Sequence, residues 1–412
     1  MSTVDWDFVK ANLNADPMAL RLKHGHEMEA AIMQIECRRK YARKFPELLC
    51  RIPEFMFPSQ LAAEQASHEW VSMLHAELTA SDPTPHIDMT GGLGLDFIHM
   101  AARGKDDGAS ALAIELDVLK ADTLAGNLQL ASLSKATVIN DDSLQVLRGM
   151  EDCSAGLIFV DPARRGSADS RIYDPADCMP DVVGNLSEIL RVGRILMVKN
   201  SPMLDIYRAL HIFKPVSHIY IVSVRNECKE VLVRISPDEP FDGIDCINIS
   251  DSCHRTTLHI SAEEWQEFCT DRTRAVAAIS YVESSRALSL DEGPLYLHEP
   301  DASVMKTGAW SILTAKFAEY SPRKLSPNCH LFVTRRPITD FPGRVICIDS
   351  IPDKRARKAL KGRRINTVCR NYPQRADKLA STLQLKPGTT DYLYGATVGP
   401  EETPILLLGH QL

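Results

Sequence analysis

The stretch HIDMTGGLGLDFIHMAARG, at positions 86–104, reads as an apolar strand, a glycine-rich turn and a helix. Three glycines, Gly91, Gly92 and Gly94, follow the strand within a few residues. Glycine loses more conformational entropy on folding than other residues, so we expect a compensating gain at this turn. Close approach of a ligand to the bare backbone is one such gain. The stretch therefore predicts a ligand site beyond the carboxyl end of a strand.

The chain around this stretch predicts an open α/β sheet. Short apolar runs predict strands over 86–90, 111–116, 136–140, 156–161, 194–199, 218–224 and 230–235. The segments between them predict helices over about 94–103, 118–130, 143–149, 180–191 and 202–211. Five strand–helix units in series indicate parallel strands with right-handed crossovers. The segment RNECK, 225–229, is too short to join parallel strands, so the last two strands form a hairpin and one of them runs antiparallel.

The residues of the turn discriminate between nucleotide ligands. Gly92 and Gly94 fit the dinucleotide pattern G-x-G-x-x-G, but Phe97 occupies the third glycine position. A phosphate-binding loop would need Gly-Lys-Ser/Thr where this chain has Leu95 and Asp96. A carboxylate in the first helical turn also disfavours phosphate there. The pattern therefore favours S-adenosylmethionine, which has no phosphate and carries a sulfonium cation and a free ammonium.

Acidic residues end the first three strands, at Asp88, Glu115 and the pair Asp141 and Asp142. A carboxylate after the second strand can accept both ribose hydroxyls, and one after the third can reach the adenine edge. The alternative is that these acids only cap the following helices. The predicted cofactor-binding residues are Asp88, Thr90, Gly91, Gly92, Gly94, Glu115, Leu116, Asp141, Asp142 and, from a preceding helix that could cover the pocket, Gln65.

The segments DMTGGLG, IELD, NDD and VDPAR, in this order, resemble class I S-adenosylmethionine-dependent methyltransferases. The DPAR segment is similar to the D-P-P-x motif of enzymes that methylate bases in RNA or DNA. The resemblance implies a Rossmann-like seven-stranded sheet and a catalytic role for Asp161, Pro162 and Arg164 at the acceptor nitrogen. Ala163 stands in place of the second proline and Arg164 in place of the usual aromatic, so the acceptor atom stays open.

Other residues near the predicted site bear on the acceptor. RNA uridine-C5 methyltransferases need a cysteine after the fifth strand, and the segment VKNSPMLD, 198–205, has none. We therefore exclude covalent carbon methylation through that strand. Asn200, at the end of the fifth strand, and Lys229, in the hairpin, are candidate substrate-binding residues; Asn200 could equally cap the next helix.

The whole chain resembles a bacterial group that combines a helical region, a methyltransferase core and C-terminal α+β modules. Matching stretches include QIECRRKYARKFP, VKNSPMLDI, RNECKEVLV, NCHLFVTRR and RNYP. The resemblance implies an N-terminal helical domain over 1–80, a Rossmann-like methyltransferase domain over 81–240, a ferredoxin-like domain over 241–343 and a THUMP-like basic domain over 344–412. THUMP domains in general bind RNA, so tRNA or rRNA is the expected partner.

Charge supports an anionic partner independently. The chain has a net charge of −7, yet the segment 321–378 contains fifteen Lys and Arg against four Asp and Glu, a net charge of +11. Basic segments supply most non-specific affinity for nucleic acids. Arg363 and Arg364 are the predicted RNA-binding residues there. The rival hypotheses are a non-catalytic RNA-binding protein with a degenerate core, and a small-molecule or protein methyltransferase.

Cysteine spacing and hydropathy set the remaining expectations. The eleven cysteines include no CxxC pair, so we expect free thiols and no metal. No run of eighteen apolar residues occurs, and no basic-then-apolar leader precedes the first helix. We expect no membrane association and a cytoplasmic enzyme.

Overall fold

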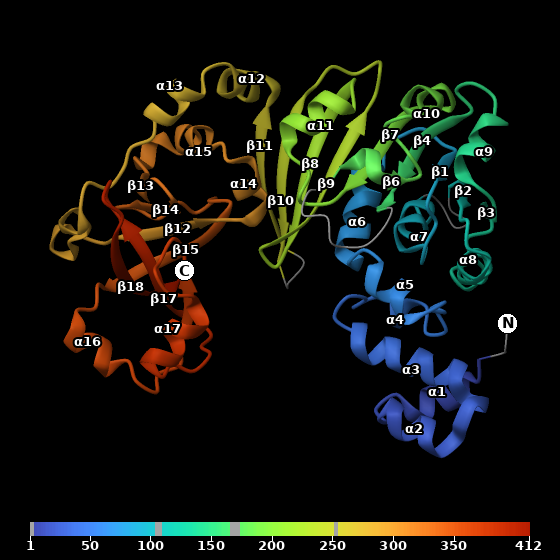
Figure 1. The fold of residues 1–412 in the computed structure, drawn as a ribbon, viewed down its shortest axis with the longest axis horizontal. Helices are drawn as coiled ribbons and strands as arrows, with labels where there is room; N and C mark the ends of the chain where they lie inside the picture. Colours follow the sequence, from blue (N-terminus) through green and yellow to red (C-terminus); the bar gives the residue numbers. More distant parts are fainter. Residues whose placement is uncertain (1–3, 104–108, 165–173, 251–253) are drawn as a thin grey trace. The chain divides into compact units, whose positions relative to one another are not determined.

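The computed structural model describes residues 4–103, 109–164, 174–250 and 254–412. The chain divides into two compact units, which we describe separately (Figure 1). The first contains residues 1–220 and 230–241, and the second contains residues 221–229 and 242–412. The division passes through the hairpin of two long strands, so each unit holds part of both.

The first unit begins with six helices, drawn in blue in Figure 1. They are α1 (Trp6–Asn12), α2 (Pro17–His24), α3 (Glu29–Tyr41), α4 (Leu48–Arg51), α5 (Gln60–Gln65) and α6 (Glu69–Leu78). The Ala- and Leu-rich stretch SQLAAEQASHEWVSMLHAEL, 59–78, predicts one continuous helix that begins at a capping serine, and that expectation is wrong. Ser59 does cap α5, but the backbone leaves the helix at Ala66, and the His68 side chain caps α6. The break places Ser67 outside both helices.

All seven predicted strands are present. They are β1 (His86–Asp88), β2 (Ala111–Ile114), β3 (Ala136–Ile139), β4 (Ala155–Val160), β7 (Gly193–Asn200), β8 (Val216–Val224) and β9 (Glu227–Ile235). Their order in the sheet is β8-β9-β7-β4-β1-β2-β3. The pairs β4–β7, β1–β4, β1–β2 and β2–β3 are parallel, whereas β7 and β9 pair antiparallel. The predicted Rossmann-like sheet with an antiparallel last strand is confirmed.

Five helices connect these strands: α7 (Leu95–Ala101), α8 (Val118–Leu130), α9 (Ser143–Arg148), α10 (Leu186–Val192) and α11 (Ile206–Ile212). The helix predicted from residue 180 begins only at Leu186, because turns occupy the preceding residues. A two-stranded ribbon, β5 (Ala163–Arg164) with β6 (Cys178–Met179), follows β4.

An apolar cluster joins the N-terminal helices to α7 and α8. It includes Phe45, Phe57, Phe97 and Leu124, all at most 1% exposed. Burying one such side chain contributes about 1.5–3 kcal/mol. Asn127 of α8 adds two hydrogen bonds to the backbone of Met56, at 2.8 and 2.9 Å. This packing, which includes Ala63 of α5, holds α5 beside α7 and α8.

The second unit adds two strands to the β8 edge: β10 (Gly243–Ile249) and β11 (Arg255–Ser261). The short apolar stretches DCINIS, 245–250, and TTLHIS, 256–261, predict two strands of a following α+β module. Both strands are present, but they belong to the same sheet as the seven predicted strands, which therefore has nine. A free sheet edge exposes unpaired backbone groups, and β10 satisfies those of β8. Two helices, α12 (Ala262–Thr270) and α13 (Arg272–Ala277), follow.

A separate sheet forms the rest of the second unit, in the order β13-β14-β12-β15-β18-β17-β16. Its strands are β12 (Tyr296–Pro300), β13 (Arg323–Ser326), β14 (Cys329–Thr334), β15 (Gly343–Ser350), β16 (Asn366–Cys369), β17 (Asp391–Val398) and β18 (Thr403–Gln411). Its helices are α14 (Ala302–Thr307), α15 (Trp310–Lys316), α16 (Lys354–Ala359) and α17 (Ala376–Leu383). The stretch EPDASVMKTGAWSILTAKF, 299–317, predicts a single helix. The structure has two helices there, because Gly308 adopts a left-handed conformation between them.

Two further expectations concern the described part of the chain. The ten cysteines found there are all free thiols. Among the same residues, no helix has the length and apolar content needed to cross a bilayer.

Candidate active site

A cavity of about 530 Å³ lies at the carboxyl ends of β1, β2 and β4. All ten predicted cofactor-binding residues line it, as does Asp161. Among the residues that the structure describes, six acids and one base line this cavity. They are Asp88, Asp96, Glu115, Asp141, Asp142, Asp161 and Lys120. So acidic a lining repels phosphate groups and attracts cations.

The glycine bend forms one wall of the cavity. Gly92 and Gly94 have φ values of +54° and +83°, a region that favours glycine. A Cβ on Gly94 would lie 2.1 Å from Leu124 Cδ1, so α8 packs directly against this residue. A Cβ on Gly92 would meet only the Thr90 carbonyl oxygen, at 3.6 Å. The two glycines therefore differ: Gly94 is needed for packing, and Gly92 leaves free space in the cavity wall.

Glu115 fastens the bend to β2. Its carboxylate accepts hydrogen bonds from the Gly92 amide at 2.7 Å and from the Asp117 amide at 2.8 Å. A carboxylate has about four acceptor positions, so Glu115 retains capacity for ligand hydroxyls. The residue both shapes the bend and presents acceptors to the cavity.

Asp88 and Thr90 connect the ends of β1 and β4. Asp88 is 3% exposed and accepts hydrogen bonds from the Thr90 amide, at 2.8 Å, and from the Thr90 hydroxyl, at 3.2 Å. The Thr90 hydroxyl oxygen in turn accepts from the Asp161 amide at 2.8 Å. Burial raises the pKa of Asp88 to about 7, the Thr90 hydrogen bonds oppose the shift, and the nearby Asp96 and Asp161 carboxylates add to it.

Lys199, near the end of β7, joins two sides of the site. Its ammonium donates to Asp161 Oδ2 at 2.5 Å and to the Ser67 hydroxyl at 2.9 Å. The Ser67 hydroxyl donates to Asp96 Oδ2 at 2.6 Å. Burial alone would lower the pKa of Lys199, but the carboxylates of Asp161, Asp96 and Glu230 outweigh it and raise the pKa. Lys199 is therefore a cation in the site.

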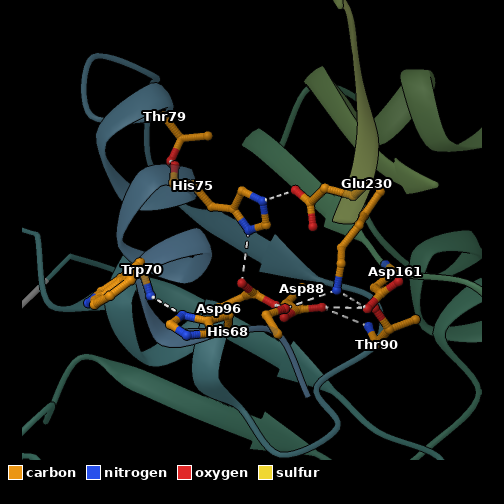
Figure 2. A network of polar contacts seen from close by, with 11 residues as sticks. His68, Trp70, His75, Thr79, Asp88, Thr90, Asp96, Asp161 and Glu230 are labelled. Carbon is orange, nitrogen blue, oxygen red and sulfur yellow. Dashed lines mark hydrogen bonds and ion pairs between the residues drawn. The ribbon is translucent and has the colours of Figure 1, made fainter. Parts of the chain in front are cut away.

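His75 of α6 lies between the carboxylates of Asp96 and Glu230 (Figure 2). Its Nδ1 lies 2.8 Å from Asp96 Oδ1, and its Nε2 lies 2.5 Å from Glu230 Oε1. The ring is fully buried. Burial alone would lower the pKa of His75, but Glu230 and Asp96 raise it to about 10. The imidazolium thus donates to both acids and ties α6 to α7 and β9.

The charges of this network do not cancel. The cations of His75 and Lys199 face the three carboxylates of Asp96, Asp161 and Glu230. One negative charge is left over, and ionised Asp88 would add a second. Uncompensated negative charge in a partly buried site favours binding of a cationic ligand.

The acids after β3 have different surroundings. Asp142 caps α9 by accepting from the Gln145 amide at 3.0 Å, as the capping alternative predicted. Asp141 is exposed, and its Oδ1 accepts from the Asp142 amide at 2.7 Å. Both line the cavity. Asp141 is the freer carboxylate of the two, because Asp142 is committed to its helix.

The remaining predicted site residues lie outside the cavity lining. Pro162 follows Asp161, and Arg164 lies in β5 opposite Cys178 of β6. Asn200 is buried and donates to the Val198 carbonyl oxygen at 3.0 Å. In the second unit, Lys229 pairs with Glu227 at 2.7 Å and Arg363 pairs with Asp391 at 3.3 Å. Arg364, also in the second unit, is exposed.

Five residues of the network were not predicted as site residues: Ser67, His75, Asp96, Lys199 and Glu230. The sequence drew attention to Asp96 only for its charge at the helix start. Lys199 follows an apolar strand run much as Asp88 and Asp161 do, and that position was a usable signal. Ser67 and His75 come from a helix break and a helix, where no motif gave either residue a role. Glu230 lies in the stretch RNECKEVLV, which carried the resemblance but gave this residue no role.

Comparison with known proteins supports this architecture. Residues 296–342 match a family described as a ferredoxin-like domain. A solved structure from Porphyromonas gingivalis W83, provisionally assigned as a methyltransferase, is 26% identical and has a TM-score of 0.78. The match covers 98% of this chain and 97% of that one. No curated protein sequence matches the chain.

Two further solved structures are more distant. A SAM-dependent methyltransferase from Agrobacterium tumefaciens is 13% identical, with a TM-score of 0.31, over 42% of this chain and 63% of that one. A provisionally assigned rRNA methylase from Clostridium thermocellum is 17% identical, with a TM-score of 0.29, over 39% of this chain and 94% of that one.

The strand order, the glycine bend and the full-length structural match define the class. The first unit has the fold of class I methyltransferases, and a ferredoxin-like domain follows it in the chain.

Proposed function

We propose that this chain is an S-adenosylmethionine-dependent enzyme that methylates a base nitrogen in structured RNA, either tRNA or rRNA. One observation carries the cofactor part of the proposal: six acids and a bare glycine bend line a cavity at the carboxyl ends of the parallel strands. Dinucleotides and nucleoside triphosphates carry phosphates that this lining would repel, whereas S-adenosylmethionine carries a sulfonium and an ammonium.

The residues of the cavity fit this cofactor. Gly92 leaves room beside the backbone, and Asp88 can pair with the ammonium. Glu115 offers acceptors to the ribose, and Asp141 offers one to the adenine edge. S-adenosylmethionine, when bound, supplies an electrophilic methyl carbon on its sulfonium.

The acceptor side centres on Asp161. Methyl transfer needs an acceptor nitrogen held in line with the methyl carbon in a site that excludes water. Asp161 can accept a hydrogen bond from an amino or ring N–H of the base. Lys199 donates a hydrogen bond to the same carboxylate. Pro162 fixes the backbone that follows, and Arg164 would stack on the base or pair with a phosphate. A base within a duplex would first have to leave the stack.

The RNA part of the proposal is supported by the basic segment of the second unit. Six of its basic side chains lie exposed in α16 and the residues that follow: Lys354, Arg355, Lys358, Lys361, Arg363 and Arg364. An exposed cluster of this density is typical of surfaces that bind phosphate backbones.

Two measurements test the proposal. Calorimetry with S-adenosylmethionine should detect binding at one site, and the absence of binding would exclude a methyltransferase. Tritium-labelled methyl transfer should then be measured on bulk tRNA and on rRNA from a strain that lacks the protein. We expect one of these RNAs to accept label and Asp161→Ala to abolish it. Cofactor binding without transfer to either RNA would favour the small-molecule or protein acceptor.

A further inference from the structure

A second group of chemically competent side chains lies on the seven-stranded sheet of the second unit. Cys347 and Asp349 belong to β15, and His410 belongs to β18. One sulfur, one carboxylate oxygen and one imidazole nitrogen from these residues all lie within 4.8 Å of one another. Thiolate, carboxylate and imidazole are the three ligand types that zinc uses in proteins.

The strand register brings these side chains to one face. Cys347 pairs directly with His410, and cross-strand partners point to the same side of a sheet. Asp349 lies two residues further along β15. Gly409 lets the strands approach closely here, since a Cβ at that position would lie 2.2 Å from the Cys347 carbonyl oxygen.

A β-bulge directs the third ligand toward the other two. Ile348 pairs with Gly409 and Ser350 pairs with Leu408, so Asp349 has no partner across the ladder. An extra residue of this kind bends the strand and re-aims its side chain. The Asp349 carboxylate lies beside the His410 ring, with Oδ1 3.0 Å from Nδ1.

Exposure makes the cluster accessible to an ion from solvent. The His410 side chain is 45% exposed and that of Asp349 is 51% exposed, while Cys347 is partly buried. Asp391 of β17 lies opposite His410 in the ladder, but its carboxylate is paired with Arg363. The cluster therefore offers three protein ligands and leaves a fourth position for water, an arrangement that suits tetrahedral zinc.

We propose that Cys347, Asp349 and His410 form a zinc-binding site. A thiolate and an imidazole select zinc over magnesium and calcium, which prefer oxygen ligands. Cys347 binds as the thiolate and releases its proton to solvent when the ion enters. The bound ion links the C-terminal strand β18 to β15, and so stabilises the sheet of the second unit. None of these three residues lines the cavity of the first unit.

The test uses the full-length chain, reduced and stripped of metal with a chelator. Zn²⁺ is titrated by calorimetry, and Co²⁺ is added as a spectroscopic probe of thiolate coordination. We expect about one zinc per chain and a thiolate-to-cobalt charge-transfer band. Cys347→Ser should weaken zinc binding at least about tenfold and abolish the band. Cys269→Ser, which removes another partly buried thiol of the same unit, is the matched control and should change neither.

A second variant keeps the test decisive if Cys347→Ser does not fold. Asp349→Asn should weaken zinc binding while the cobalt band remains, because the thiolate is still present. The proposal is overturned if the stripped chain binds no zinc, or if Cys347→Ser leaves both the affinity and the band unchanged. Methyl transfer does not enter either readout, so the outcome is separate from that of the proposed function.

Discussion

At the scale of single residues, the burial of Asp88 makes the stability of the chain depend on pH. Its pKa is raised to about 7 from an ordinary 3.8 because the carboxyl is buried beside other acids. The folded chain therefore holds a proton there that the unfolded chain loses near pH 4. Stability should fall as the pH rises from about 4 to about 7, since ionisation then opposes folding.

The substitution Asp88→Asn tests this. It keeps an oxygen acceptor for Thr90 but cannot ionise, so the unliganded variant should melt at a higher temperature than the wild type at pH 8. The same variant should bind S-adenosylmethionine more weakly, because the partner of its ammonium is gone. Melting curves at pH 5 and pH 8 provide the check. Asp122→Asn, at an exposed position of α8, is the control and should not alter the pH profile. A variant less stable than the wild type at pH 8 would refute the assignment.

Lys199 is the second residue with a specific expectation. Lys199→Met removes the partner of Asp161 while keeping the bulk of the side chain. We expect the methyl-transfer rate to fall by at least about tenfold, with the dissociation constant for S-adenosylhomocysteine changed less than about threefold, since Lys199 serves the acceptor side. Lys120→Met, in the cavity lining but remote from Asp161 in sequence, is the comparison. Equal losses of binding and rate would place Lys199 on the cofactor side instead.

At the scale of elements, the turn between β1 and α7 contains one glycine needed for packing and another that leaves room for a ligand. Gly94→Ala would force a left-handed alanine against Leu124, and we expect a loss of at least about 2 kcal/mol in the free energy of unfolding. Gly92→Ala shares the positive φ but meets open space, so its loss should be about 1 kcal/mol. Denaturant titration measures both. Gly92→Ala should nevertheless lose cofactor affinity; if it binds normally, the cofactor does not touch this bend.

The link between α6, α7 and β9 depends on the charge of His75. Its pKa in the folded chain, about 10, exceeds the ordinary 6.5, so its contribution to stability is complete below about pH 6.5 and is lost as the pH rises through about 10. His75→Gln should lower stability at pH 7 and flatten the decline between pH 7 and pH 10. Chemical denaturation across that range checks the prediction. His211→Gln, an exposed histidine of α11, should retain the wild-type profile.

At the scale of the whole molecule, the basic segment divides into two groups. Arg344 and Arg370 pair with Glu299, whose side chain is 1% exposed, so they stabilise the second unit. Lys324 is buried, and its ammonium donates to the Pro327 carbonyl oxygen. The net charge of +11 therefore overstates what a ligand can meet. The exposed bases of α16 and the residues after it are the part that the proposed RNA could contact.

This division predicts which charges affect RNA binding. The double variant Lys358→Glu with Lys361→Glu should weaken RNA binding and make it less dependent on salt, by about 0.7 in the log–log slope for each lost phosphate contact. Filter binding at several salt concentrations measures the slope. Lys23→Glu with Lys214→Glu makes the same change in net charge at exposed positions of the first unit. If the two double variants weaken binding equally, only net charge matters.

Much of the first unit follows from the sequence. A strand or a turn is formed by residues that are close in the sequence. Apolar runs separated by glycine and acidic residues therefore predicted the seven strands of the Rossmann-like sheet and the cavity-lining residues at their ends. The antiparallel direction of one strand also followed from the sequence, because the connection RNECK, 225–229, is too short to join parallel strands. Local patterning is enough here because parallel strands carry their carboxyl ends to a common edge.

Only the tertiary structure determines which cations pair with the acids at that edge. His75, Lys199 and Glu230 come from a helix, a parallel strand and an antiparallel strand, and they meet Asp96 and Asp161 only after the chain has folded. The same is true of Cys347 and His410, which lie 63 positions apart in the sequence but face each other across one ladder. Charge pairing and metal coordination depend on distances of a few ångströms between remote residues, and no local pattern in the sequence records those distances.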